Sequence, residues 1–150
     1  MKKSICNPAA LAIAFGLSLA TAHAETCTEL AAAGLTDASL KGYDAAVLME
    51  VIEHVDEPRL PALADAVFGH AHPATVIVTT PNVEYNANYA GLTGMRHHDH
   101  RFEWDRATFA RWAAQVADDF GYTVAIGGIG AQDETLGAPT QLAVFSAGAA

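Results

Sequence analysis

The feature that most constrains this chain is an alternation of buried-strand and helix patterns. Residues 43–51, YDAAVLMEV, form a short apolar run, and residues 74–80, ATVIVTT, are rich in β-branched side chains. Such runs are typical of strands buried on both faces of a sheet. Between them, residues 57–70 contain Pro58, which suits the first turn of a helix, and place apolar side chains at helical spacing. The alternation predicts an α/β sheet with helices against its faces.

The rest of the chain continues this pattern. Residues 82–102 form a long polar connection, and in a compact domain a connection of that length is usually functional. Residues 105–119 have the spacing of a second amphipathic helix, and residues 122–126 and 140–146 have the composition of two last strands. We therefore expect one α/β domain over residues 35–146.

The N-terminal residues 1–24 have the composition of a secretory signal. Two lysines precede an apolar run over residues 9–22, and alanines at 22 and 24 suit cleavage before Glu25. A buried N-terminal helix is the alternative interpretation. Residues 25–34 are expected to be a short linker or helix, and residues 147–150 a tail. No segment is expected to span a membrane in the mature chain, because the apolar run is too short and no other is longer.

Composition narrows the classes of function. With 150 residues there is room for a single domain. The formal net charge of −9 argues against broad electrostatic binding to nucleic acid or anionic membranes, so any contact with a polyanion must be local. Cys6 and Cys27 lack the spacing of a thiolate zinc site.

Ionisable side chains gather where the two strand patterns end. Glu50, Glu53 and His54 follow the first strand, and we expect a helical turn to point them to one side. The second strand leads into a loop whose ionisable residues are His97, His98, Asp99 and His100. Carboxylates combined with imidazoles suit a divalent ion such as Mn²⁺ or Mg²⁺. The alternative for the first cluster is a solvated start of a helix.

Basic residues are concentrated in the same region. Four of the chain's eight basic residues lie in or just after the histidine-rich loop: Arg96, Arg101, Arg106 and Arg111. They are candidate contacts for phosphate, although ordinary pairing with nearby acids is an equal alternative. Phe102 and Trp104 could stack on a base, but such a pair beside an amphipathic helix is more often part of a core.

Four blocks of the sequence together resemble one family. GYDAAVLMEVIEHVDEPRL, VIVTTPNVEYN, RHHDHRFEWDRATFARWA and PTQLAVF are similar, in order and spacing, to the small-RNA 3′-terminal ribose 2′-O-methyltransferases of the HUA ENHANCER type. The resemblance implies the second half of a class I, Rossmann-like S-adenosylmethionine-dependent methyltransferase sheet with flanking helices. It implies a divalent ion, Mn²⁺ or Mg²⁺, whose ligands are Glu50, Glu53, His54 and His100.

The resemblance also implies an activity and further roles. The family's ion holds the hydroxyls of the ribose at an RNA 3′ end, and a methyl group moves from S-adenosylmethionine to the 2′ oxygen. His54 or His98 would accept the proton, and Arg96 and Arg101 would contact the RNA. In bacteria, such an enzyme has an RNA-repair kinase and ligase as partners.

The N-terminal part departs from the family's pattern. No strand followed by a glycine-rich turn precedes Gly42, so the S-adenosylmethionine-binding residues are unknown, and we expect a truncated or rearranged product with little activity alone. The family implies a cytoplasmic location, whereas the leader over residues 1–24 argues for export. The alternative function is therefore an exported metal-binding or interaction module without catalysis.

Overall fold

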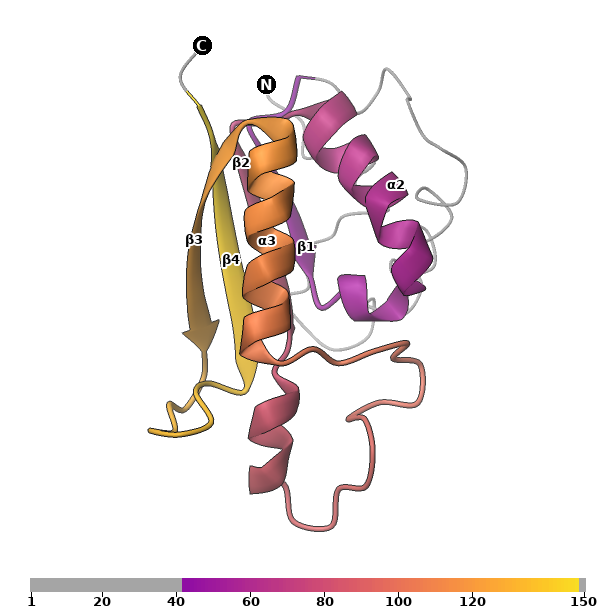
Figure 1. Ribbon diagram of the computed structural model, residues 1–150, viewed down its shortest axis with the longest axis vertical. Helices are drawn as coiled ribbons and strands as arrows, with labels where there is room; N and C mark the ends of the chain where they lie inside the picture. Colours follow the sequence, from indigo (N-terminus) through magenta and orange to yellow (C-terminus); the bar gives the residue numbers. More distant parts are fainter. Residues whose placement is uncertain (1–41, 149–150) are drawn as a thin grey trace.

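The computed structural model describes residues 42–148, which form one sheet with helices packed against it (Figure 1). The strands are β1 (Ala45–Met49), β2 (Thr75–Pro81), β3 (Tyr122–Ile129) and β4 (Thr140–Ala147). Their spatial order is β1-β2-β4-β3. β1 and β2 pair in parallel, whereas β4 is antiparallel to both of its neighbours. The leader expected at residues 1–24 and the linker at 25–34 lie outside the described residues.

The predicted helix over residues 57–70 is wrong in detail, because the segment is not one regular α-helix. It begins as the 3₁₀ turn η3 (Glu57–Arg59), continues as α2 (Leu60–Ala64) and ends as the π-helix η4 (Asp65–Ala71). Pro58 suits the first turn, but Pro61 has no amide hydrogen to donate to the carbonyl of Glu57, which accepts a 3₁₀ bond from the Leu60 amide instead. At the other end, the amide of His72 donates to the carbonyl of Val67, five residues back, at 3.1 Å, which is the wider π spacing.

The second helix matches its prediction closely. α3 (Arg106–Phe120) begins after Asp105, whose Oδ1 accepts from the Thr108 amide at 2.7 Å, and ends at Gly121, with a φ of 74°. The side-chain cap and the left-handed glycine satisfy the backbone groups that the helix ends leave unpaired. Figure 1 shows α3 lying along β4 and β3.

The core lies between the helices and one face of the sheet. Phe68 from η4, Phe109 from α3 and Phe145 from β4 are all at most 1% exposed. The rings of Phe68 and Phe145 meet edge-on with centroids 4.7 Å apart, a favourable aromatic geometry. Phe102 is buried and stacks on the partly buried Trp104 with centroids 4.3 Å apart, and both rings pack with the core.

The parallel pairing of β1 and β2 brings two strand ends together. Met49 is paired with Thr79, and the next residue, Glu50, adopts a left-handed φ of 51°. The Glu50 amide donates to the carbonyl of Thr79 at 3.1 Å and to its hydroxyl at 3.0 Å. A non-glycine residue in this conformation is strained, and these bonds hold it. The expected helical turn from Glu50 is therefore wrong: the chain turns sharply there, and a 3₁₀ turn, η2 (Ile52–His54), follows.

The long polar connection after β2 is more ordered than a plain loop. It starts with the 3₁₀ helix η5 (Val83–Asn88), capped by Asn82, whose Oδ1 accepts from the Glu84 amide at 3.0 Å. The extended loop that follows η5 returns to the sheet beside η2 (Figure 1). Among residues 42–148, no helix is both long enough and apolar enough to cross a membrane.

Candidate metal centre

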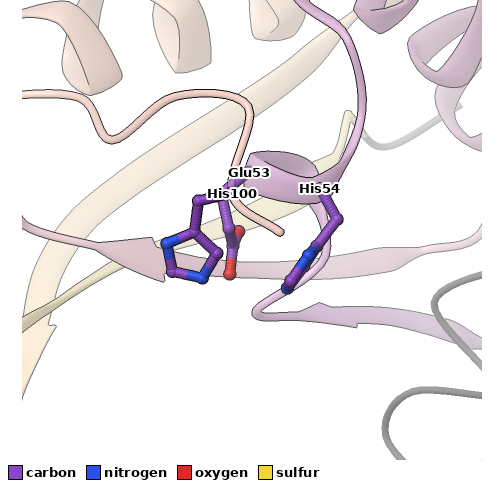
Figure 2. Close-up of side chains that lie close together, drawn as sticks. All are labelled: Glu53, His54 and His100. Carbon is purple, nitrogen blue, oxygen red and sulfur yellow. The ribbon is translucent and has the colours of Figure 1, made fainter. Parts of the chain in front are cut away.

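Three of the four predicted metal ligands are brought together. Glu53, His54 and His100 each offer a ligand atom, and these atoms lie within 4.8 Å of one another. Figure 2 shows their side chains directed toward the same space, Glu53 and His54 from η2 and His100 from the histidine-rich loop. Glu50 is outside this group, although its charge acts on the carboxyl of Glu53.

The core and one backbone bond position these side chains. Ile52 and Val55, on either side of Glu53 and His54, are fully buried and anchor η2. The amide of Arg101 donates to the carbonyl of Glu53 at 2.7 Å. Because Arg101 follows His100 directly, this bond holds the imidazole of His100 beside η2.

The carboxylates of the site have unmet bonding capacity. Glu53 is fully buried, and its Oε2 accepts from the Thr80 hydroxyl at 3.0 Å. Glu53 Oε1 and Glu50 Oε1 are buried without a hydrogen-bond partner among the described residues. Unpaired buried polar atoms are costly and rare, and a bound ion can satisfy them. The unpaired oxygen of Glu53 beside two imidazoles fits a divalent cation that accepts oxygen and nitrogen ligands.

The electrostatics of the site favour uncharged side chains until a cation arrives. Burial, followed by the charge of Glu50, raises the pKa of Glu53 to about 8. Burial also raises the pKa of Glu50. The pKa of His54 is lowered, first by burial and then by His100 and His97. A cation would reverse the balance for the carboxyls, because it favours their ionised form.

His100 is held by the carboxylate of Glu103, which was not among the predicted site residues. Its Nδ1 lies 2.6 Å from Oε1 of Glu103. Burial by itself would raise the pKa of Glu103, but hydrogen bonds from the Arg96 amide, the Asn86 side chain and His100 lower it. The three-residue spacing between His100 and Glu103 was the available signal in the sequence.

The other members of the histidine-rich loop lie at the surface. The side chain of His98 is 82% exposed, and its Nε2 lies 3.0 Å from Asp99 Oδ1. The ring centroid of His97 lies 6.2 Å from that of His54. His97, His98 and Asp99 form a second, exposed group of metal-capable side chains. The role of His98 as a proton acceptor stays a prediction.

The two arginines predicted to contact RNA differ sharply. The guanidinium of Arg96 donates from Nη1 to the Pro139 carbonyl at 2.8 Å, from Nη2 to the Asn82 carbonyl and from Nε to Asn86 Oδ1. Each of its three nitrogens therefore makes a hydrogen bond within the protein, which uses three of its five N–H donors. Arg101 is 59% exposed and lies 3.5 Å from Asp56, a loose surface pair that leaves it accessible to an anion.

Known proteins are similar to this region in both sequence and fold. No protein-family model matches the chain. It is 42% identical over 113 residues to the small RNA 2′-O-methyltransferase of Xenopus tropicalis, covering 73% of this chain and 31% of that protein. Its structure is similar to the methyltransferase domain of a bacterial Hen1 protein, with a TM-score of 0.68, 50% identity, and coverage of 77% of this chain and 57% of that domain.

A chain in the solved structure of a larger complex is also similar to this protein. The Pnkp1/Rnl/Hen1 RNA repair complex contains a chain that matches with a TM-score of 0.57 and 27% identity, over 75% of this chain and 24% of that one. These likenesses confirm the predicted α/β methyltransferase fold. The chain spans about a third of the length of the Xenopus relative. By sequence and by fold, it belongs to the small RNA 2′-O-methyltransferase family.

Proposed function

We propose that this chain provides the metal-binding and ribose-binding part of an enzyme that methylates the 2′ oxygen of an RNA 3′-terminal ribose. The observation that carries the proposal is the buried Glu53, whose unpaired oxygen lies beside His54 and His100. Nothing in the fold itself needs an unpaired carboxyl at this place, and a divalent cation would satisfy it. The family relationship supports methyl transfer to small RNA as the reaction.

The chain's own residues would do the following. Glu50, Glu53, His54 and His100 would hold Mn²⁺ or Mg²⁺, and Glu50 would need to approach the other three. When bound, such an ion lowers the pKa of a coordinated hydroxyl and orients it. Burial lowers the pKa of His54, which favours its neutral form. An imidazole that holds the ion has no free lone pair, so His54 could accept the proton of the 2′ hydroxyl only when it is not a ligand. The exposed His98 would otherwise accept it.

The remaining assignments concern RNA, cofactor and partners. Arg101 is accessible and next to His100, so it would contact the phosphate nearest the ribose. S-adenosylmethionine is the methyl donor that the family relationship favours, and we assign no residue to its binding. Similarity to a chain of the RNA repair complex supports an RNA-repair kinase and ligase as partners. A function of this kind would be cytoplasmic.

Metal binding is the direct test of the site. The full chain should bind Mn²⁺ in equilibrium dialysis or calorimetry, and Glu53→Ala or His100→Ala should weaken binding strongly. Asp118→Ala is the matched control, because Asp118 is an exposed acid on α3, away from the ligand cluster. Equal affinity in all four proteins would refute the ligand assignment.

Methyl transfer is tested separately. Transfer of a labelled methyl group from S-adenosylmethionine to a small RNA should require the 2′ hydroxyl of the last nucleotide, so an RNA ending in a 2′-deoxy sugar should accept none. Equal labelling of both RNAs would refute the proposed acceptor. The exported-module alternative predicts instead a mature protein that begins at Glu25 outside the cytoplasm and transfers no methyl group.

A further inference from the structure

We propose that Glu103 is a positioning residue that keeps a proton on Nδ1 of His100 and so leaves Nε2 of that ring free to bind the metal ion. This inference rests on the proposed function for its purpose, but its physical content is a property of the metal-free protein. The observation behind it is the distance of 2.6 Å between His100 Nδ1 and Glu103 Oε1.

The donors around Glu103 require its carboxyl group to be ionised and to act only as a hydrogen-bond acceptor. Its side chain is 0% exposed. Oε1 accepts from the Arg96 amide at 2.7 Å, and Oε2 accepts from Asn86 Nδ2 at 2.7 Å. Both are donors that cannot accept a proton in return, so an ionised carboxylate is the form that satisfies them. Toward His100 the same oxygen must also accept, and the imidazole therefore donates from Nδ1.

The tautomer of His100 follows from this bond. A neutral imidazole carries one proton, and a proton on Nδ1 makes Nε2 the nitrogen with a free lone pair. Metal-binding histidines commonly donate their other N–H to a carboxylate, which orients the ring and strengthens it as a ligand. Figure 2 shows the imidazole of His100 beside the carboxylate of Glu53. Glu103 would therefore aim a prepared nitrogen into the ligand cluster.

Glu103 is itself anchored by a chain of bonds that explains the role of Arg96. Asn86, which donates to Glu103, accepts from Nε of Arg96. The same guanidinium reaches the carbonyls of Asn82, before η5, and of Pro139, before β4. Arg96 thus ties the loop to two fixed parts of the fold and helps to hold Asn86 and Glu103 in place.

A neutral replacement of Glu103 cannot reproduce this arrangement. In Glu103→Gln, one end of the amide is NH₂, which donates. If NH₂ takes the place of Oε2, it faces the donating Asn86; if it takes the place of Oε1, it faces the Arg96 amide and His100. In the second orientation His100 must accept at Nδ1, and its proton moves to Nε2, where it blocks metal binding.

The tautomer can be measured directly in the metal-free full chain. Long-range proton–nitrogen NMR of uniformly ¹⁵N-labelled protein distinguishes Nδ1–H from Nε2–H histidine, and His100→Gln identifies the His100 signals by their loss. We expect Nδ1–H in the wild type and a shift toward Nε2–H or a mixture in Glu103→Gln. A wild-type His100 with its proton on Nε2 would overturn the proposal.

Metal affinity gives the second readout. Removing such a supporting carboxylate typically weakens metal binding by about 10–100-fold, so we expect the Kd for Mn²⁺ to rise by that factor in Glu103→Gln. The matched control is Glu57→Gln, because Glu57 also accepts a side-chain bond in this region, from Trp104 Nε1 at 2.8 Å, and it does not touch His100. The control should bind Mn²⁺ as the wild type does.

A conservative variant separates positioning from folding. Glu103→Asp keeps the charge and should retain more Mn²⁺ affinity than Glu103→Gln, with the Nδ1–H tautomer preserved. Equal Kd values for wild type and Glu103→Gln, or equal losses in the Asp and Gln variants with an unchanged tautomer, would contradict the positioning role. If the wild type binds no Mn²⁺ at all, the metal site fails, while the tautomer measurement still decides what Glu103 does.

Discussion

Replacing Glu53 by glutamine should stabilise the metal-free protein at alkaline pH while abolishing metal binding. Glu53 is fully buried, one of its oxygens has no partner among the described residues, and its pKa is raised from 4.5 to about 8. In the unfolded chain this carboxyl ionises at its ordinary value. Between these two pKa values the folded state holds the proton and the unfolded state does not, so the free energy of unfolding falls as the pH rises from about 4.5 to 8 and then levels off.

The size of the effect follows from the shift. At about 1.4 kcal/mol per pKa unit, the rise to about 8 corresponds to a loss of roughly 5 kcal/mol above pH 8. Glutamine has nearly the same shape, carries no charge, and can still accept from the Thr80 hydroxyl. Its NH₂ group would inherit the unpaired position and keep a penalty of about 1–3 kcal/mol. We therefore expect Glu53→Gln to be more stable than the wild type by roughly 2–4 kcal/mol at pH 8.5.

Urea unfolding at pH 5 and pH 8.5, with and without Mn²⁺, is the assay. At pH 5 the metal-free Glu53→Gln should be no more stable than the wild type, and less stable by up to about 2 kcal/mol, because the wild-type carboxyl is still protonated in the folded state and the unpaired amide of the variant keeps its penalty. At pH 8.5, Mn²⁺ at 100 times its Kd should stabilise the wild type by about 2.7 kcal/mol and leave Glu53→Gln unchanged. A metal-free variant that is less stable than the wild type at pH 8.5 would refute the reasoning.

Three further predictions follow from the same geometry. The affinity for Mn²⁺, measured by calorimetry in several buffers, should increase between pH 6.5 and 8 by up to about tenfold per unit, with proton release, because the ion must displace the proton of Glu53; an affinity independent of pH would contradict this. Arg101→Ala should weaken RNA binding, measured by filter binding, and lower the salt dependence of that binding. Arg96→Lys should chiefly lower the melting temperature, because it breaks the bonds to two carbonyls. The opposite pattern in the two measurements would reverse the two assignments. Asp105→Ala removes the cap of α3 and should cost about 1 kcal/mol in urea unfolding, while Asp118→Ala on the exposed side of α3 should cost much less.

The fold was largely predictable because its strands and α3 rely on local patterns. β-branched runs indicated β2, and Asp105 and Gly121 marked the ends of α3 within one or two residues. The segment over residues 57–70 was harder, since apolar spacing alone does not distinguish a regular helix from one that begins as 3₁₀ and ends as π. At its start, Pro61 cannot donate to the carbonyl of Glu57, and at its end the His72 amide reaches back five residues to Val67.

The residue types of the site could be predicted from the sequence, whereas their arrangement in space could not. Carboxylates and imidazoles following two strands predicted an oxygen- and nitrogen-rich metal site, since ligand preference depends on side-chain chemistry alone. The sequence could not show that Glu50 adopts a left-handed turn outside the cluster, or that the guanidinium of Arg96 is used internally. Both depend on tertiary contacts. The parallel pairing of β1 and β2 places Thr79 beside the Glu50 amide, and the returning loop places the carbonyls of Asn82 and Pro139 beside Arg96.

The sequence by itself therefore determined the α/β class, the family relationship and the identity of the chemical groups, because these depend on composition, periodicity and order along the chain. Only the tertiary structure decided which of those groups meet. Packing buries Glu53 and so raises its pKa. The bond from the Arg101 amide to the Glu53 carbonyl brings the histidine-rich loop to η2, and the shape of that loop places the carboxylate of Glu103 against His100. Burial and hydrogen-bond geometry are properties of the packed molecule, and they turn a crowd of ionisable side chains into an ordered site.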